Sequence, residues 1–250
     1  MPAISLVIPA YNEAERIVGT VTDALEYFER KGLASEIIVS ADGTDSTREL
    51  VSALAAARPG IVVIGSPERR GKGRGIREGV ALATGDIIGF TDADNKTPID
   101  ELDKVLPLLT GGADLVIGSR AGEAALIERP QKLYRRVGSR GFALFMHAAV
   151  GLNGIADTQC GFKFFRGDVA RDLFTRQQID GYMYDVEILY LAKCAGYRLE
   201  QVPVRWRDDG DSRLDLIAGN VRNVRDVLSV RWMHRRAAPR RVPVPSSSRP

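Results

Sequence analysis

Residues 86–94 read DIIGFTDAD, an apolar run that ends in two carboxylates separated by one residue. The apolar run predicts a buried β-strand, so Asp92 and Asp94 should stand at its C-terminal end. Mg²⁺ and Mn²⁺ are hard cations that bind few protein carboxylates and complete their coordination with water and phosphate oxygens. The pair therefore predicts a Mg²⁺ or Mn²⁺ site for a nucleotide diphosphate substrate, although solvated turns also collect aspartates.

On both sides of this strand, short apolar runs alternate with segments of helical periodicity. Pro9 is expected to close the first strand, and the apolar residues from Ile17 to Phe28 recur at helical spacing. The alternation predicts an α/β fold with a mostly parallel sheet that helices cover on both faces. The expected strands span residues 4–8, 36–40, 61–65, 87–90 and 115–118, and the expected helices span 17–28, 46–57 and 75–83.

Polar clusters follow three of the expected strands, at residues 9–13, 42–45 and 92–94. Ligands of parallel α/β sheets sit beyond the carboxyl ends of the strands, so the three clusters should meet at one edge. There Asp42 could accept a hydrogen bond from a nucleoside base or a ribose hydroxyl, and Tyr11 could stack on the base. A capping role for Asp42 and an ordinary exposed aromatic at Tyr11 are the alternatives.

The segment GKGRG at residues 71–75 precedes an expected helix. Glycines at such a place let backbone N–H groups, and here the Lys72 ammonium, approach an anion near the helix N-terminus. The segment is not a Walker loop, because that pattern needs a glycine where Ser66 stands and a serine or threonine where Gly73 stands. A flexible turn without a ligand is the alternative interpretation.

Composition separates a mildly charged body from a basic C-terminal end. The chain has 250 residues, of which 44% are hydrophobic and 27% charged, and a formal charge of +3. Six arginines and no acid fall in the last twenty residues, so the rest of the chain carries a formal charge of −3. This distribution argues against nucleic acid as a partner and favours a terminal contact with an anionic surface such as lipid. A disordered basic tail over residues 236–250 fits equally well, because its Pro, Arg and Ser composition cannot bury enough apolar area to fold.

Two cysteines and two histidines are too few for a disulfide framework or a zinc-ligand cluster. No basic and apolar leader pattern follows Met1, and the sequence has no uninterrupted apolar run of about 18 residues. We therefore expect a cytoplasmic protein that does not cross a membrane, with peripheral contact at the cytosolic membrane face as a further option.

Two segments have the pattern of basic amphipathic helices, residues 130–152 and residues 214–232. Packing on the protein's own core is the usual explanation of this pattern, and contact with a membrane surface or a second subunit is the alternative. In the second segment the expected apolar side consists of Leu216, Ile217, Val221, Val224, Leu228 and Trp232.

Four motifs occur in the order typical of family 2 glycosyltransferases of the GT-A fold, and the chain resembles this family from residue 4 to about residue 232. The motifs are SLVIPAYNE at 5–13, GKG at 71–73, DAD at 92–94 and GSR at 118–120. Three later motifs are similar to those of the dolichyl-phosphate β-glucosyltransferases and their bacterial and archaeal polyprenyl-phosphate relatives. These are DTQCGFK at 157–163, YDVEILY at 184–190 and VRW at 204–206.

The resemblance implies an inverting, metal-dependent enzyme that transfers a hexose, with glucose from UDP-glucose as the first choice, to a polyprenyl or dolichyl phosphate. It also implies one domain over residues 1–235, with a nucleotide-binding half over about 1–120 and an acceptor half over about 121–235. Asp92 and Asp94 would hold Mg²⁺ or Mn²⁺. The substrate-binding positions that it implies or favours are Pro9, Tyr11, Asn12, Glu13, Asp42, Lys72, Gly73, Arg120 and Gln159.

Two features depart from the family pattern. The chain has Ala41-Asp42 where relatives commonly carry two aspartates, which leaves the nucleoside open. It also shows no pattern for the C-terminal transmembrane helices of many relatives. Access to a lipid acceptor would then come through the amphipathic segments or a partner protein, unless the acceptor is not a lipid.

The nature of the acceptor decides whether a base is needed. In a single displacement, negative charge builds on the leaving diphosphate, where the cation would stabilise it. A phosphate monoester is already largely a dianion at neutral pH, so the protein would only position it, and Lys163, Arg213 and Arg140 are the candidate cations. An alcohol would need a base, for which Asp157 ranks before Asp185 and Glu187.

Three other functions remain open at this point. A soluble glycosyltransferase could use a GDP- or UDP-sugar and a non-lipid acceptor. A nucleotidyltransferase would place its glycine-rich loop after the first strand, where this chain has residues 9–13 instead. A non-catalytic scaffold would keep the fold but would not need the acids of residues 92–94 and 157–163 together.

Overall fold

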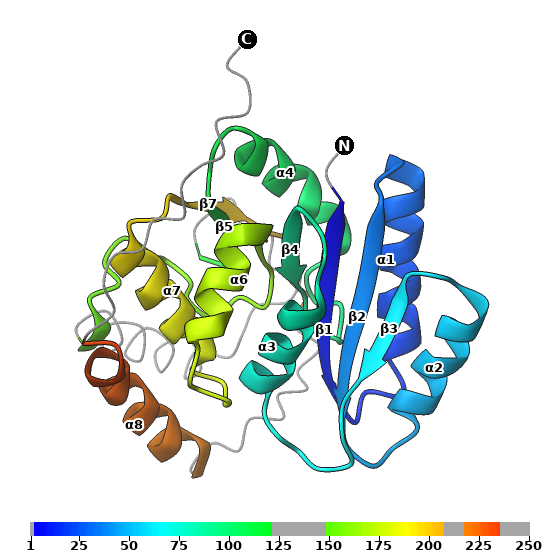
Figure 1. Cartoon of the computed structure of the whole chain (residues 1–250), viewed down its shortest axis with the longest axis horizontal. Helices are drawn as coiled ribbons and strands as arrows, with labels where there is room; N and C mark the ends of the chain where they lie inside the picture. Colours follow the sequence, from blue (N-terminus) through cyan, green and yellow to red (C-terminus); the bar gives the residue numbers. More distant parts are fainter. Residues whose placement is uncertain (1–2, 122–148, 208–217, 236–250) are drawn as a thin grey trace.

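The computed structural model describes residues 3–121, 149–207 and 218–235, and Figure 1 shows their arrangement. Within these residues, one seven-stranded sheet has the strand order β3-β2-β1-β4-β6-β5-β7. Its strands are β1 (Ile4–Tyr11), β2 (Ser35–Asp42), β3 (Ile61–Ile64), β4 (Ile87–Phe90), β5 (Leu115–Ser119), β6 (Lys163–Arg166) and β7 (Leu199–Pro203).

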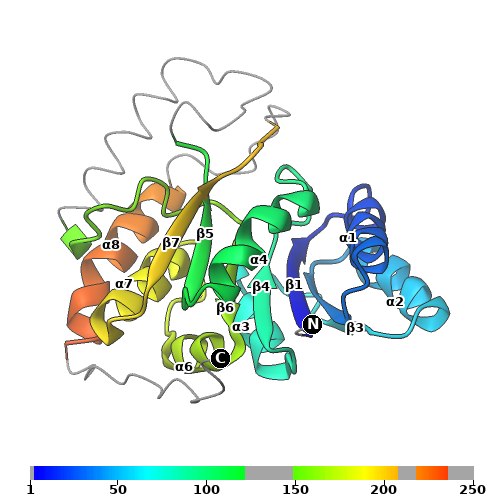
Figure 2. The same cartoon turned by 90° about the horizontal axis from the view of Figure 1, so that it is seen from above.

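Helices cover both faces of this sheet, as Figure 2 shows. One face carries α1 (Ile17–Lys31), α2 (Thr47–Ala57), the short 3-10 helix η1 (Ile99–Glu101) and α4 (Leu102–Thr110). The other carries α3 (Lys72–Leu82), α6 (Gly167–Arg176), α7 (Tyr184–Ala195) and α8 (Ala218–Met233). Leu6 and Ile8 of β1 belong to the first core and Val7 to the second, because successive side chains of a strand point to opposite faces. The predicted α/β fold with a mostly parallel sheet is confirmed.

The first strand, β1, extends beyond Pro9, the residue at which the sequence predicted its end. β1 continues through Pro9, so the prediction that Pro9 closes the strand was wrong. The N–H of Asn12 donates to Asp42 O, so the backbone N–H groups of the even-numbered residues of β1 point toward β2. The backbone nitrogen of Pro9 therefore faces the β4 side. β4 pairs with β1 only as far as Val7, so the missing N–H of Pro9 interrupts no ladder bond.

The alternating pattern predicted neither β7 nor β6, and β6 has the less expected position in the sheet. It lies between β4 and β5 and runs antiparallel to both. Phe164 packs into one core and Phe165 into the other, so this short strand is buried on both faces. A pattern of alternating strands and helices predicts parallel neighbours and therefore gives no sign of an antiparallel strand between β4 and β5.

The order of the strands creates a switch point between β1 and β4. From β1 the chain proceeds outward to β2 and β3 on one side, and β4 begins the other side. The carboxyl end of β1 lies at the lower end of Figure 1, close to the start of α3. Open α/β sheets bind their ligands beyond the strand ends at such a point.

α8 is the helix expected in the second amphipathic segment, but it presents a different side to the core. Its buried residues include Asn223, Val227 and Val230, whereas Leu228 and Trp232 of the expected apolar side are exposed. The assignment of the core-facing side was therefore wrong. The buried His234 directly after the helix contacts the buried Glu187 carboxylate, in keeping with the side that carries Val227 and Val230 facing the core.

Several expectations fall outside the described residues. These are most of the 130–152 helix with Arg140, the start of the 214–232 segment with Arg213, and the 236–250 tail. In the part of the chain that is described, no helix combines the length and apolar character needed to span a membrane.

Candidate active site

A cavity of about 1130 Å³ opens at the carboxyl ends of β1, β2 and β4. The structure therefore brings the three polar clusters together at one edge of the sheet. The residues that line it from these clusters and from the glycine-rich segment are Pro9, Tyr11, Glu13, Asp42, Lys72, Asp92 and Asp94. The opposite wall consists of residues 178–182 and of Arg222, Asn223, Asp226, Ser229 and Met233 in α8.

Asp92 and Asp94 follow β4 and face this cavity. Asp92 Oδ1 accepts a hydrogen bond from Lys72 Nζ at 2.5 Å, and Asp94 Oδ2 lies 3.3 Å from Lys96 Nζ. The side chain of Asp92 is 40% exposed and that of Asp94 is 21% exposed, so both can be reached from the cavity. Hard carboxylate oxygens on a cavity wall fit a divalent cation that takes its other ligands from phosphate and water. Among the described residues no group of three or more His, Cys, Asp or Glu side chains is placed to hold a metal ion.

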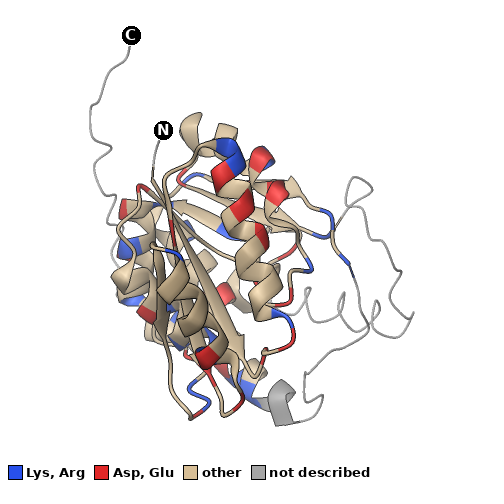
Figure 3. Cartoon of the chain, turned by 90° about the vertical axis from the view of Figure 1, so that its right-hand side faces the viewer, with Lys and Arg blue, Asp and Glu red and all other residues tan. Residues whose placement is uncertain are grey.

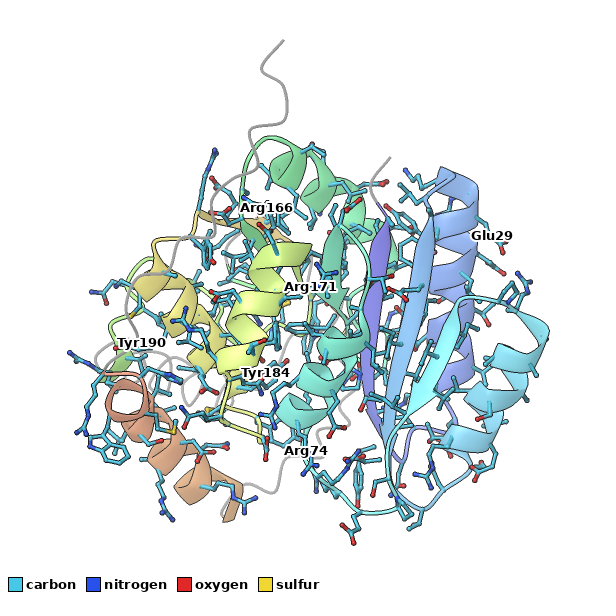
Figure 4. All side chains as sticks on the ribbon, viewed as in Figure 1. Glu29, Arg74, Arg166, Arg171, Tyr184 and Tyr190 are labelled. Carbon is cyan, nitrogen blue, oxygen red and sulfur yellow. The ribbon has the colours of Figure 1, made fainter. Side chains whose placement is uncertain are left out.

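Lys72 stands at the first position of α3, beside these acids. Burial opposes its charge, yet Asp92, Asp185 and Asp94 raise the pKa of the Lys72 ammonium above its ordinary value. The preceding Gly71 has φ +109°, and a Cβ there would meet Asp180 O at 2.3 Å. Only glycine lets the loop come this close to the opposite wall. Figure 4 shows Arg74, in the first turn of α3, at the lower end of the molecule where the carboxyl end of β1 also lies.

Asp42 and Tyr11 form the nucleoside side of the cavity in the predicted arrangement. Asp42 Oδ2 accepts a hydrogen bond from the Arg70 backbone N–H at 2.8 Å. The guanidinium of Arg69 lies 4.5 Å from the centroid of the Tyr11 ring, and Arg69 Nη2 donates to Tyr182 OH at 3.1 Å. A base that stacked on Tyr11 would therefore take the place of Arg69. Sequence reasoning missed both arginines, although they directly precede the glycine-rich segment.

Two of the predicted substrate-binding residues support the site without lining it. Asn12 Oδ1 accepts hydrogen bonds from the N–H groups of Thr44 and Asp45, at 3.0 and 3.3 Å. Asn12 thereby fixes the loop after β2. Gly73 is buried in the first turn of α3, where a Cβ would meet Ile179 O at 2.6 Å.

Arg120 and Asp157 form a two-pronged ion pair at the end of β5. Arg120 Nε donates to Asp157 Oδ2 at 2.7 Å, and Arg120 Nη2 donates to Oδ1 at 3.0 Å. The backbone N–H groups of Arg120 and Gln159 donate to the same carboxylate at 3.0 and 3.1 Å. Burial alone would raise the pKa of Asp157, but the Arg120 guanidinium holds it below its ordinary value. A carboxylate with so many donors and a low pKa is a weak general base.

Lys163 and Asp185 form a second pair that is buried behind the cavity wall. Lys163 Nζ donates to Asp185 Oδ1 at 2.7 Å and to Cys160 O at 2.6 Å, and the Lys163 side chain has no exposed surface. Burial raises the pKa of Asp185, although Lys163 opposes this. Burial likewise raises the pKa of the Cys160 thiol to about 11, so this cysteine is not an activated nucleophile. The predicted acceptor cation Lys163 therefore lies beneath the site and not on its surface.

Glu187 is also buried and binds the far wall of the cavity from behind. Its two oxygens accept hydrogen bonds from the N–H groups of Gln178 and Ile179, both at 2.8 Å. His234 Nε2 lies 2.6 Å from Glu187 Oε1. Gln178 and Ile179 line the cavity, so Glu187 positions this wall and does not itself reach a substrate in the cavity.

Gly161 connects the 157–163 motif to the acid pair. A Cβ at Gly161 would lie 2.1 Å from Asp92 Oδ2, which is far closer than a side chain can come. The absence of a side chain at residue 161 therefore gives the Asp92 carboxylate its position. The sequence showed Gly161 only as one letter of a motif, because its contact with Asp92 depends on the pairing of β6 with β4.

This geometry defines the class of the protein. The cavity brings paired acids and a glycine–lysine segment together at the switch point of the sheet, where open α/β sheets bind their ligands. The chain is a glycosyltransferase and belongs to glycosyl transferase family 2, whose model matches residues 5–174. The predicted family resemblance is confirmed.

Curated relatives support the same assignment over most of the chain. A dolichyl-phosphate β-glucosyltransferase of Trichomonas vaginalis is 34% identical over 237 residues, which cover 90% of this chain and 70% of the relative. The dolichyl-phosphate β-glucosyltransferase of Saccharomyces cerevisiae is 30% identical over 252 residues, which cover 92% of this chain and 75% of the relative.

Solved structures confirm the GT-A fold. Glucosyl-3-phosphoglycerate synthase of Mycobacterium tuberculosis, in complex with Mn²⁺, UDP and glucosyl-3-phosphoglycerate, has a TM-score of 0.65 at 24% identity and covers 92% of this chain and 80% of its own. Mannosyl-3-phosphoglycerate synthase of Rubrobacter xylanophilus has a TM-score of 0.68 at 20% identity and covers 96% and 77%. At these identities the likeness establishes the fold alone.

Proposed function

We propose that the chain transfers glucose from UDP-glucose to a polyprenyl phosphate such as dolichyl phosphate, with inversion at the anomeric carbon, at the cytosolic face of a membrane. One observation carries the proposal. In this family 2 glycosyltransferase, Lys72, Asp92 and Asp94 lie on the wall of a cavity that continues to α8. The relatives that are about one-third identical over most of the chain are named as dolichyl-phosphate β-glucosyltransferases.

At the donor end, the chain's own residues would bind and orient the nucleotide sugar. Asp42 and Tyr11 would contact the nucleoside, and the Lys72 ammonium would contact the diphosphate. Asp92 and Asp94 would hold Mg²⁺ or Mn²⁺, which supplies positive charge where the leaving diphosphate gathers negative charge. A solved structure of the same fold contains Mn²⁺ together with UDP, which is the pair of ligands proposed for this cavity.

None of the three acids predicted as a base is placed as a free base. Asp157 is held by Arg120, Asp185 by Lys163, and Glu187 by two backbone N–H groups. A phosphate monoester does not need a base, because its second pKa is near 6 and it is largely a dianion at neutral pH. The engagement of all three acids therefore supports the proposal of an acceptor that brings its own ionised nucleophile.

The two halves of the domain would divide these tasks. Residues 1–120 would bind the donor, and residues 121–235 would bind the acceptor and close the cavity. Arg222 is the described cation on the α8 wall of the cavity that could meet the acceptor phosphate, and the earlier candidates Arg140 and Arg213 stay predictions.

The test is a transfer assay with a panel of donors and acceptors in Mn²⁺. The donors are UDP-glucose and GDP-mannose, and the acceptors are a short-chain prenyl phosphate, the corresponding prenol and 3-phosphoglycerate. We expect product from UDP-glucose and prenyl phosphate. The double variant Asp92→Asn/Asp94→Asn should lose activity by about 10²-fold or more, and Asp100→Asn, which removes an exposed acid, should not.

Other products would contradict specific parts of the proposal. Transfer to 3-phosphoglycerate in preference to prenyl phosphate would overturn the lipid acceptor. Equal use of the prenol would overturn the argument that no base is needed. Absence of both transfer and UDP-glucose hydrolysis would overturn the proposed function as a whole.

A further inference from the structure

α8 has two sides with different surroundings. One edge lines the cavity through Arg222, Asn223 and Asp226. The other side carries Leu228 and Trp232, which are the most exposed large apolar side chains among the described residues, at 59% and 66%. Together with Val224, Arg225 and Ser229 they border a shallow, open depression. We call the side with Val224, Arg225, Leu228, Arg231 and Trp232 the outer face of α8.

This helix is more basic than the side of the molecule drawn in Figure 3. Acidic and basic residues are intermingled on the side of the molecule drawn in Figure 3. From residue 222 to residue 235 the chain instead has four arginines and one acid, and that acid, Asp226, lines the cavity. The outer face is thus basic and apolar at once. The Arg235 guanidinium also lies 5.1 Å from the Trp232 ring, as arginine and tryptophan commonly pair where an apolar surface meets water.

Buried contacts fix this face relative to the cavity. α8 packs against α7, and Figure 4 shows Tyr190 of α7 beside α8. His234 Nε2 contacts the buried Glu187 Oε1 at 2.6 Å, and the His234 ring lies 6.5 Å from the Tyr190 ring. The same Glu187 binds the cavity wall at Gln178 and Ile179. A surface that met the outer face of α8 would therefore lie directly beside the mouth of the cavity.

We propose that the outer face of α8 docks on an anionic lipid bilayer, with Leu228 and Trp232 in the interfacial region and Arg225, Arg231 and Arg235 against the headgroups. Tryptophan favours the membrane interface, and an apolar strip flanked by arginines binds anionic lipid through both buried area and charge. Docking in this orientation would present the cavity to a lipid phosphate from the same leaflet. The inference rests on the proposed function only in this last step.

The experiment uses the full chain and vesicles of two compositions, pure phosphatidylcholine and phosphatidylcholine with phosphatidylglycerol. We expect sedimentation with the anionic vesicles alone and release at high salt, because exposed charge pairs are screened. Leu228→Ser/Trp232→Ser should weaken vesicle binding by about tenfold or more, and Arg225→Gln/Arg231→Gln should weaken it several-fold. Leu82→Ser removes another exposed apolar side chain, 50% exposed on α3, and should bind like the parent chain.

Fluorescence locates the contact on the helix. The chain has two tryptophans, so a Trp206→Phe background leaves Trp232 as the reporter. Its emission should shift to the blue on anionic vesicles and should be quenched by brominated lipid. An unchanged Trp232 spectrum during vesicle binding would overturn the assignment of this face.

Two further outcomes would also overturn the inference. If the chain forms dimers that Leu228→Ser/Trp232→Ser converts to monomers, the outer face is an interface between copies. If that variant binds anionic vesicles like the parent chain, the membrane contact lies elsewhere. Transfer from UDP-glucose to a water-soluble prenyl phosphate should be unchanged in the variant, so a loss of vesicle binding is distinguishable from a failure of the proposed function.

Discussion

The charged residues of the GKG and DAD motifs line the cavity, whereas those of the DTQCGFK and YDVEILY motifs are paired behind its wall. Lys72, Asp92 and Asp94 are partly exposed at the strand ends. Lys163, Asp185 and Glu187 have side chains that are at most 5% exposed. The difference indicates two uses of charge. One set is available to bind a substrate, and the other set holds the backbone that gives the first set its geometry.

The largest effect should come from breaking a buried pair. Lys163→Ala leaves the Asp185 carboxylate buried without its cation, so we expect the free energy of unfolding to fall by about 3–5 kcal/mol. Lys31→Ala removes one partner of the exposed Lys31–Asp103 pair and should cost about 1 kcal/mol or less. Urea denaturation of both variants measures the difference.

A double variant shows whether the charge or the packing of Lys163 matters. Lys163→Met/Asp185→Asn removes both charges and should recover part of the lost stability. Equal losses for Lys163→Ala and Lys31→Ala would contradict the contrast between buried and exposed charge, because they would mean that Lys163 behaves as a surface residue.

The contact of Gly161 with Asp92 should have the next largest effect. Gly161→Ala forces the Asp92 carboxylate to move, and we expect a loss of about 10²-fold in transfer, as is typical when one group that stabilises the transition state is displaced. Because the displaced atoms belong to a flexible side chain, the thermal unfolding temperature should change little. A kinetic assay together with a melting curve makes the test, and unaltered kcat/KM would show that Asp92 is not held by this contact.

Asp157 should act on stability with a defined dependence on pH. Its pKa is lower in the folded chain than in the unfolded chain because of Arg120, so its contribution is present above the unfolded pKa of about 4 and is lost as the pH falls through the folded pKa. Asp157→Asn should therefore be less stable than the parent chain by about 1–3 kcal/mol near neutral pH. The difference should narrow below about pH 4.

Turnover of the same variant separates positioning from base catalysis. With prenyl phosphate as acceptor, Asp157→Asn should retain measurable transfer, since the acceptor is already ionised. Complete loss of kcat in a variant that remains folded would assign Asp157 the role of a base.

The smallest effect is expected at the rim of the donor end. Arg69 occupies the face of Tyr11 on which a base would stack, so Arg69→Ala should leave the affinity for UDP-glucose unchanged or strengthen it by a factor of about 2–5. Tyr11→Ala should weaken it. Titration calorimetry distinguishes the cases, and weaker binding by Arg69→Ala would indicate that Arg69 contacts the nucleotide.

The sequence predicted the strands and motifs of the first half of the chain well because their signals are local. The strands β1 to β4, the acid pair and the glycine–lysine segment are all visible within short windows of apolar period and spacing. The second half depends on contacts between distant residues. Arg120 and Asp157 are 37 positions apart, and Glu187 and His234 are 47 positions apart. The insertion of β6 and the rotation of α8 follow from such contacts, so periodicity alone assigned the wrong side of α8 to the core.

The central claim is that Asp92 and Asp94 hold a cation against the donor diphosphate. Titration calorimetry of UDP-glucose with and without Mn²⁺ tests this claim most directly. We expect binding that requires Mn²⁺ in the parent chain and in Asp100→Asn, and no Mn²⁺-dependent binding in Asp92→Asn/Asp94→Asn. Equal affinity with and without Mn²⁺, or Mn²⁺-dependent binding that survives in the double variant, would contradict it.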